Sequence, residues 1–341
     1  MKVAILTPFY RQATVGNAVT ARRLEIHLGK LGCVTELFSL DTLTPGRLKT
    51  AVTGFSPDII HAFHGIRCGA LAAEISTETR IPYIITITGT DLYRGDATTV
   101  TNKERAQIGN AAALVVFHEV IAHRVVAAFP EHARRVHIIP QGVAVPADGS
   151  ADILPESPFI FLLPAGIRPV KNILSSFRPL EQLWRKYPQI RLLLAGPVLD
   201  KGYAEEVMEA LARCPFAAWL GEIPHAAMPA LYRSAHVVLN TSLSEGGMAN
   251  SILEAMAYSR PVLVSAVEGN RSLVSDGENG FLFASEEDFI DKAESLLLDK
   301  ALRKKIAAAG RSYVLAHCSA DQEAESYLQL YMNILANTKG V

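Results

Sequence analysis

The stretch Asn240–Met256 reads N-T-S-L-S-E-G-G-M-A-N-S-I-L-E-A-M and follows the short apolar run 237–239. The apolar run predicts a buried strand, and Ile252 and Met256 have the spacing of the inner face of a helix. Between them lies a loop with Glu245 and two glycines, which let the backbone approach a bulky ligand. Unpaired N–H groups at a helix start attract anions. Taken alone, the stretch fits an anion-binding loop and an ordinary strand-to-helix turn equally well.

Length and composition limit the classes of protein to consider. A chain of 341 residues suits two domains of roughly 150 residues each. The net charge of −1, from 33 Lys and Arg against 34 Asp and Glu, gives no basic field that would indicate nucleic acid. The four cysteines are scattered without a C-x-x-C pair, which predicts reduced thiols, a cytoplasmic location and no structural zinc. No window approaches the roughly 20 apolar residues of a membrane span.

Apolar runs alternate with helical patterns in both halves of the chain, which predicts an α/β protein with two doubly wound, parallel-sheet domains facing a cleft. The small polar residues and prolines of 141–157 indicate the linker. The domain boundaries expected are 1–150 for an acceptor domain and 158–318 for a donor domain. Residues 319–341 are expected to form a last helix that packs back on the first domain.

The first helix is expected from Ala18 onward, ending before Gly32. Its helical spacing predicts a buried stripe and a solvated face. The stripe contains Ala21, Leu24, Leu28 and Leu31, and the solvated face contains Arg22, Arg23, Glu25 and Lys30.

Several common nucleotide-binding patterns are absent from the sequence. Neither half has G-x-G-x-x-G after its first strand, and no P-loop or G-x-S-x-G elbow occurs. The loop 165–172 instead places Arg168 and Lys171 three residues apart at a predicted strand end. An arginine and a lysine together suit the dispersed charge of a diphosphate. The alternative is that these cations only form salt bridges.

The second half resembles the retaining GT-B glycosyltransferases of family 4. The motifs that carry the resemblance lie in order at 166–171, 195–197, 220–224, 231–235, 244–257, 261–263 and 277–280. The resemblance implies two Rossmann-like domains and a nucleotide-sugar donor, with Arg168 and Lys171 on its diphosphate and Glu254 on its ribose. One residue more than the family's usual pattern separates Glu245 from Glu254. The donor-binding residues implied are Gly166, Gly221, Ile223, Gly246, Gly247, Met248, Ala249, Asn250 and Glu254.

The first half is similar to a small subgroup of that family, which includes bacterial selenosugar synthases and animal glycosyltransferase-1-domain proteins. Thr88 stands where most members have a histidine, and a threonine cannot exchange a proton at neutral pH as imidazole does. His64 and Arg67 are the replacements expected, although a packed histidine and a surface arginine are the alternative. The acceptor-side residues implied are Gly16, Asn17, Arg67, Thr88 and Asp91, the last of which could instead cap a helix.

The resemblance implies a retaining, metal-independent glycosyltransferase that moves a hexose-type sugar from a nucleotide diphosphate sugar, most simply a UDP-sugar. Arg168, Lys171, Glu245 and His64 are the catalytic residues expected, and the nucleotide sugar is the only co-substrate. The other partner is a small-molecule or glycan acceptor; membrane contact and oligomeric state stay open. Two alternatives remain: transfer to selenophosphate, and a catalytically silent nucleotide-sugar-binding protein.

Overall fold

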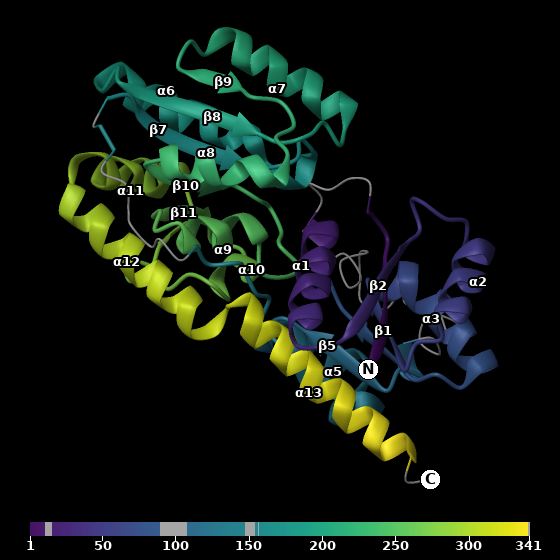
Figure 1. The fold of residues 1–341 in the computed structure, drawn as a ribbon. Helices are drawn as coiled ribbons and strands as arrows, with labels where there is room; N and C mark the ends of the chain where they lie inside the picture. Colours follow the sequence, from purple (N-terminus) through teal and green to yellow (C-terminus); the bar gives the residue numbers. More distant parts are fainter. Residues whose placement is uncertain (11–15, 89–107, 147–153, 156, 340–341) are drawn as a thin grey trace. The chain divides into compact units, whose positions relative to one another are not determined.

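The computed structural model describes residues 1–10, 16–88, 108–146, 154–155 and 157–339. The chain forms two compact units, Met1–Gly142 with Cys318–Val341, and Val143–His317. Each contains a parallel six-stranded sheet with helices on its faces (Figure 1). The predicted α/β class is therefore confirmed.

The sheet of the first unit has the strand order β2-β1-β3-β4-β5-β6. The strands are β1 (Lys2–Thr7), β2 (Val34–Ser39), β3 (Ile59–Phe63), β4 (Tyr83–Thr86), β5 (Ala113–Val116) and β6 (Val136–Ile138). The helices are α1 (Gly16–Lys30), α2 (Pro45–Phe55), α3 (Gly65–Thr79), α5 (Glu119–Ala128) and α13 (Ala320–Lys339), with a 3-10 helix over Pro130–Arg135.

The helices α1 and α3 cover opposite faces of this sheet. Leu24 of α1 packs with Ile5 of β1, whereas Ile75 of α3 packs with Leu6, the next residue of the same strand. Successive side chains of a strand point to opposite faces. The direction of winding therefore reverses between β1 and β3, and α/β sheets bind ligands at such a switch point.

The sheet of the second unit has the order β12-β11-β10-β7-β8-β9, so its winding reverses between β7 and β10. The strands are β7 (Phe159–Pro164), β8 (Ile190–Ala195), β9 (Ala217–Trp219), β10 (Val237–Asn240), β11 (Val262–Ser265) and β12 (Phe281–Phe283). The helices are α6 (Phe177–Lys186), α7 (Lys201–Arg213), α8 (Met228–Ser234), α9 (Asn250–Ala257), α10 (Glu268–Arg271), α11 (Glu286–Leu298) and α12 (Lys300–His317).

Two helices begin or end differently from what helical spacing alone suggests. Residues 173–176 form a 3-10 turn, since Asn172 adopts a left-handed conformation with φ of 46°, and α6 begins only at Phe177. Leu31 lies beyond the end of α1 and is 38% exposed, so it does not belong to the buried stripe.

The prediction that Arg23 lies on a solvated face is wrong. Its side chain is buried, with Nε 2.9 Å from Glu323 Oε2 and Nη2 3.2 Å from Glu323 Oε1. Glu323 belongs to α13, which packs along α1 (Figure 1). Helical periodicity identifies one buried face, and here a helix from the other end of the chain buries a second.

The helix α13 also contacts the sheet through a buried polar cluster. His61 of β3 is fully buried, and burial lowers the pKa of its imidazole to about 3. Its Nδ1 lies 2.7 Å from the Tyr331 hydroxyl and its Nε2 lies 2.7 Å from Thr86 Oγ1, which is 2.9 Å from the Tyr327 hydroxyl. The neutral imidazole thus links β3, β4 and α13.

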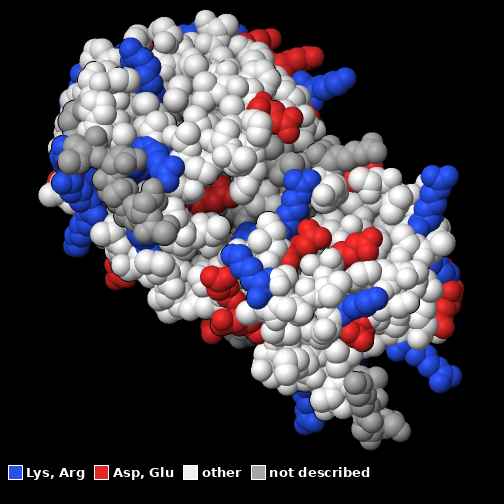
Figure 2. Space-filling view, viewed as in Figure 1, with Lys and Arg blue, Asp and Glu red and all other residues white. Residues whose placement is uncertain are grey.

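Charged side chains are interspersed on the surface. Figure 2 shows Lys, Arg, Asp and Glu side chains scattered over a face that is mostly uncharged. Among the described residues, no helix combines the length and the apolar character needed to cross a bilayer.

The buried Arg23–Glu323 pair gives a stability prediction. Replacing Arg23 by methionine leaves Glu323 charged, buried and unpaired, so we expect the free energy of unfolding to fall by about 3–5 kcal/mol. Denaturant unfolding followed by circular dichroism measures this change. The double variant Arg23→Met with Glu323→Leu should recover most of the loss.

The control for this prediction is Arg47→Met on the exposed face of α2, which should change stability by less than about 0.5 kcal/mol. A loss at Arg23 no larger than the loss at Arg47 would show that the buried pair does not hold α13 in place.

Candidate functional site

The loops after β7 and β10 meet at the switch point of the second sheet. Leu243 N donates to the Val170 carbonyl at 2.9 Å, and Thr241 Oγ1 donates to the Lys171 carbonyl at 2.8 Å. These bonds join the basic loop 165–172 to the start of the glycine-containing loop. The two segments singled out in the sequence therefore form one site.

At the centre of this site Lys171 forms an ion pair with Glu245. Glu245 Oε1 also accepts from Ser242 Oγ at 2.7 Å and from Asn240 Nδ2 at 3.1 Å. Burial opposes ionisation of this carboxyl, but the Lys171 ammonium and the hydrogen bonds outweigh it and lower the pKa of Glu245. The pair is therefore ionised at neutral pH. The sequence left open that the two cations of the basic loop only form salt bridges. Lys171 does form one in this structure.

Arg168 differs from Lys171 in having no ion-pair partner among the described residues. Its Nε is buried and makes no hydrogen bond to any described residue. Leaving a buried charged donor unsatisfied costs more than the 1–3 kcal/mol of a neutral group, so such a group calls for a partner, such as a water molecule or an ion. An anion bound at this loop would satisfy it.

The helix α9 begins at Asn250, directly after the glycine-containing loop. Its N-cap residue, Ala249, has no side-chain acceptor and forms no capping hydrogen bond. The first amides of α9 therefore receive no capping hydrogen bond from the Ala249 side chain. This is compatible with an anion-binding site at the start of the helix. The predicted succession of strand, loop and helix across Asn240–Met256 is confirmed.

Glu254 lies one turn into α9 and is held by two residues that sequence reasoning missed. Tyr232 donates its hydroxyl to Glu254 Oε2 at 2.7 Å, and His225 Nε2 lies 2.8 Å from Oε1. Burial, followed by the Glu254 charge, raises the pKa of Tyr232 well above its usual value, so the phenol stays protonated. Spacing in the sequence does not predict this grouping, because His225, Tyr232 and Glu254 belong to three separate elements.

Two residues of α10, Gly269 and Asn270, support the loop that contains Glu245. The sequence analysis did not single them out. A Cβ atom at Gly269 would lie 2.3 Å from the Glu245 carbonyl oxygen and 2.7 Å from that of Gly247. The fully buried Asn270 donates through Nδ2 to Asn240 Oδ1 at 3.3 Å and to the Ser265 carbonyl at 2.9 Å. Only a glycine at 269 allows α10 to pack this closely.

The remaining donor-side residues follow β7 and β9. A Cβ at Gly166 would lie 2.6 Å from Leu199 Cδ1, so this glycine permits close packing of the loops after β7 and β8. Gly221 has a left-handed φ of 79°, and Ile223 is half-buried. Exposed apolar side chains follow the neighbouring strands: Val198 and Leu199 come after β8, and Leu220 comes after β9.

The acceptor-side residues of the first unit gather at its own switch point. Asn17 Nδ2 donates to Thr88 Oγ1 at 3.4 Å. His64 is buried and caps α3, where its Nδ1 accepts from the Arg67 amide at 3.3 Å. Its φ of 74° is strained for a side chain with a Cβ, a condition that clusters at functional sites. Gly16 begins α1, whereas Asp91 lies outside the described residues.

Arg67 has its guanidinium 5.1 Å from the centre of the Phe9 ring. In the part of the chain that the structure describes, no three His, Cys, Asp or Glu side chains come together as metal ligands would.

The Lys171–Glu245 pair predicts a pH dependence of stability. The folded-state pKa of Glu245 lies below the unfolded value of about 4.3, so the pair contributes stability above that pH and loses it as the pH falls through the folded-state value. We expect Glu245→Gln to reduce the free energy of unfolding by about 3 kcal/mol at pH 7. Denaturant titrations at pH 7 and at about pH 3 should show the deficit shrinking in acid. An equal deficit at both pH values would contradict the ionised pair.

Two family models match the chain, one in each unit. The model for glycosyl transferases group 1 matches residues 150–313, and that for a glycosyl transferase 4-like domain matches residues 2–142. Glycosyltransferase 1 domain-containing protein 1 of Xenopus tropicalis is 26% identical over 344 residues, covering 96% of each chain. The putative glycosyltransferase EpsD of Bacillus subtilis is 28% identical over 193 residues, which cover 54% of this chain and 49% of EpsD.

Solved structures share the fold along nearly the whole chain. HepE of Anabaena, in complex with UDP and glucose, has a TM-score of 0.78 at 16% identity and covers 97% of this chain and 99% of HepE. Sucrose-phosphate synthase from Thermosynechococcus elongatus has a TM-score of 0.79 at 19% identity, with coverage of 98% and 99%. The chain belongs to the group 1 glycosyltransferases of family 4 and adopts their GT-B fold.

Proposed function

We propose that this glycosyltransferase moves a hexose-type sugar from a UDP-sugar to an acceptor, with retention of configuration and without a metal ion. The observation that carries the proposal is Arg168, whose buried Nε has no hydrogen-bond partner among the described residues. It lies in the same loop as Lys171 and at the same switch point as the start of α9. A diphosphate carries the dispersed negative charge that these groups are able to hold.

The other contacts are the ones that the family resemblance implies. With the diphosphate at the β7 and β10 loops, the ribose hydroxyls face Glu254 and the transferred sugar faces Glu245. The nucleobase then lies toward Gly221 and Ile223, where apolar side chains are exposed. The HepE structures contain UDP and UDP-glucose, which supports uridine as the nucleoside of the donor.

Catalysis is mainly electrostatic in this account. The bond between the anomeric carbon and the diphosphate oxygen breaks, and the negative charge that develops on the oxygen is stabilised by Arg168, Lys171 and the α9 amides. The acceptor forms its bond on the face that the diphosphate leaves, and its proton passes to the departing diphosphate. No strong protein base is needed, which is compatible with Thr88.

His64 contributes as a hydrogen-bond donor rather than as a base. Because Nδ1 accepts from the Arg67 amide, the ring N–H lies on Nε2. Together with the Arg67 guanidinium, this favours an acceptor with negative charge. Selenophosphate is therefore a second candidate acceptor beside a hydroxyl compound.

Release of UDP from a panel of nucleotide sugars tests the proposal. We expect turnover with at least one UDP-sugar, and proton NMR of the product should show the anomeric configuration of the donor. Lys171→Ala should lower turnover by at least about 100-fold, since the lost charge acts on the leaving group. Lys201→Ala, at the exposed start of α7, is the matched control and should stay active. A fully active Lys171→Ala, or an inverted product, would refute this mechanism.

Gly269 gives a separate prediction about the Glu245 loop. A methyl group at this position collides with the Glu245 and Gly247 carbonyls, so Gly269→Ala should displace the loop and lower kcat by at least about tenfold. Gly202→Ala is the control, because a Cβ there meets only Asp200 Oδ1 at 3.7 Å. Steady-state kinetics and thermal unfolding of both variants make the comparison. Equal activity of the two would show that α10 does not position Glu245.

A further inference from the structure

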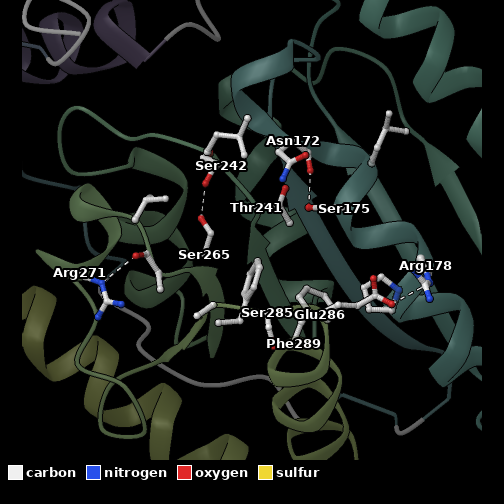
Figure 3. Close-up of a pocket in the computed structure, with 17 residues that line it drawn as sticks. Asn172, Ser175, Arg178, Thr241, Ser242, Ser265, Arg271, Ser285, Glu286 and Phe289 are labelled. Atoms are coloured by element: carbon white, nitrogen blue, oxygen red, sulfur yellow. Dashed lines mark hydrogen bonds and ion pairs between the residues drawn. The ribbon is translucent and has the colours of Figure 1, made fainter. Parts of the chain in front are cut away.

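A pocket of about 660 Å³ adjoins the proposed donor site in the second unit (Figure 3). Thr241 of its lining donates to the Lys171 carbonyl at 2.8 Å. Ser242, also in the lining, donates to Glu245 Oε1 at 2.7 Å. The pocket therefore belongs to the part of the site that would hold the diphosphate and the transferred sugar. Glu254, the proposed ribose ligand, is not among the lining residues, and its own partners determine how it can act.

The Glu254 carboxylate is partly occupied by two donors from the protein. A carboxylate can only accept, and it has about four lone-pair positions, shared equally by its two oxygens. Tyr232 takes one position on Oε2, because its hydroxyl donates to that oxygen at 2.7 Å. His225 takes one position on Oε1, where its Nε2 lies at 2.8 Å and carries the donated hydrogen. One position on each oxygen is left without a donor from the described residues.

The two remaining positions fit the vicinal diol of a ribose. The 2′- and 3′-hydroxyls sit on neighbouring carbons, so each is able to donate to one oxygen of the same carboxylate. A 2′-deoxyribose supplies only one of these donors and leaves the other oxygen without its partner. A site built to hydrogen-bond a hydroxyl discriminates strongly against the analogue that lacks it.

The two donors also fix the orientation of the carboxylate. The terminal torsion of a glutamate has a broad energy profile, so the carboxylate turns easily unless both oxygens are held. Tyr232 holds one oxygen from the interior, since it is fully buried and stacks on Tyr258 with a centroid distance of 5.8 Å. His225 holds the other from the open side, because its side chain is 49% exposed and that of Glu254 only 13%.

We infer that His225 and Tyr232 are positioning residues that hold Glu254 in the orientation that binds both ribose hydroxyls. Through Glu254 they select a ribonucleotide donor over a deoxyribonucleotide donor. This inference rests on the proposed function, in which Glu254 is the ribose ligand. The two residues act on recognition of the nucleoside and not on the sugar that is transferred.

Calorimetric titration of the full chain with UDP and with 2′-deoxy-UDP tests the inference. The parent should bind UDP at least about tenfold more tightly than 2′-deoxy-UDP, as expected for a hydrogen bond to a charged group. His225→Ala and Tyr232→Phe should each weaken UDP binding by at least about fivefold and reduce the preference to below about threefold. His225→Gln should restore it, because the glutamine amide places an N–H donor near the position of imidazole Nε2.

Two variants outside the donor site serve as controls. Tyr187→Phe matches Tyr232→Phe, because the Tyr187 hydroxyl also donates to a glutamate, Glu294, at 2.8 Å. His123→Ala, at an exposed position of α5, matches His225→Ala. Both controls should keep the parent's preference for UDP, and thermal unfolding of every variant reports on its fold.

Glu254→Ala separates failure of the inference from failure of the proposed function. A parent without a preference for UDP, or a Glu254→Ala variant that keeps it, would show that Glu254 does not bind the ribose and would overturn both. A preference that depends on Glu254 but is unchanged in His225→Ala or Tyr232→Phe would overturn the role of that residue alone. Tighter UDP binding by His225→Ala would also overturn it, because the imidazole would then occupy the place of the ribose.

Discussion

The Lys171–Glu245 ion pair is the contact on which the candidate site depends. It joins the loop after β7 to the loop after β10. The winding of the sheet reverses between these two strands. A buried carboxylate without Lys171 would cost several kcal/mol, and Ser242 and Asn240 satisfy the same oxygen of Glu245. The pair therefore fixes two loops that carry the other charged groups of the site.

This arrangement has a consequence for ligand binding. Lys171 is neutralised by Glu245 in the structure, whereas Arg168 has a buried donor without a partner among the described residues. An incoming diphosphate would therefore find Arg168 unsatisfied and would compete with Glu245 for Lys171. In the proposed mechanism the Glu245 carboxylate would then lie beside the sugar, so that nucleotide binding and the placement of Glu245 would be coupled through Lys171.

Sequence alone predicted the parts of this molecule that rest on local pattern. The alternation of apolar runs with helical spacing gave the two parallel sheets, and the glycine loop before Asn250 gave the start of α9. Pattern could not place Arg23, since its burial depends on α13 from the far end of the chain. It also missed His225 and Tyr232, because only the folded sheet brings the segments after β9 to Glu254. The role of Gly269 could not be predicted either, because its close contacts with Glu245 and Gly247 exist only in the folded chain.

The central claim is that Arg168 and Lys171 bind the donor diphosphate, and calorimetric titration of UDP tests it most directly. The account predicts that Arg168→Ala and Lys171→Met each weaken UDP binding by at least about tenfold, as expected for hydrogen bonds to a charged group. Glu245→Gln, which releases Lys171 from its partner, should bind UDP at least as tightly as the parent. UDP affinity that is unchanged in both cation variants would contradict the account.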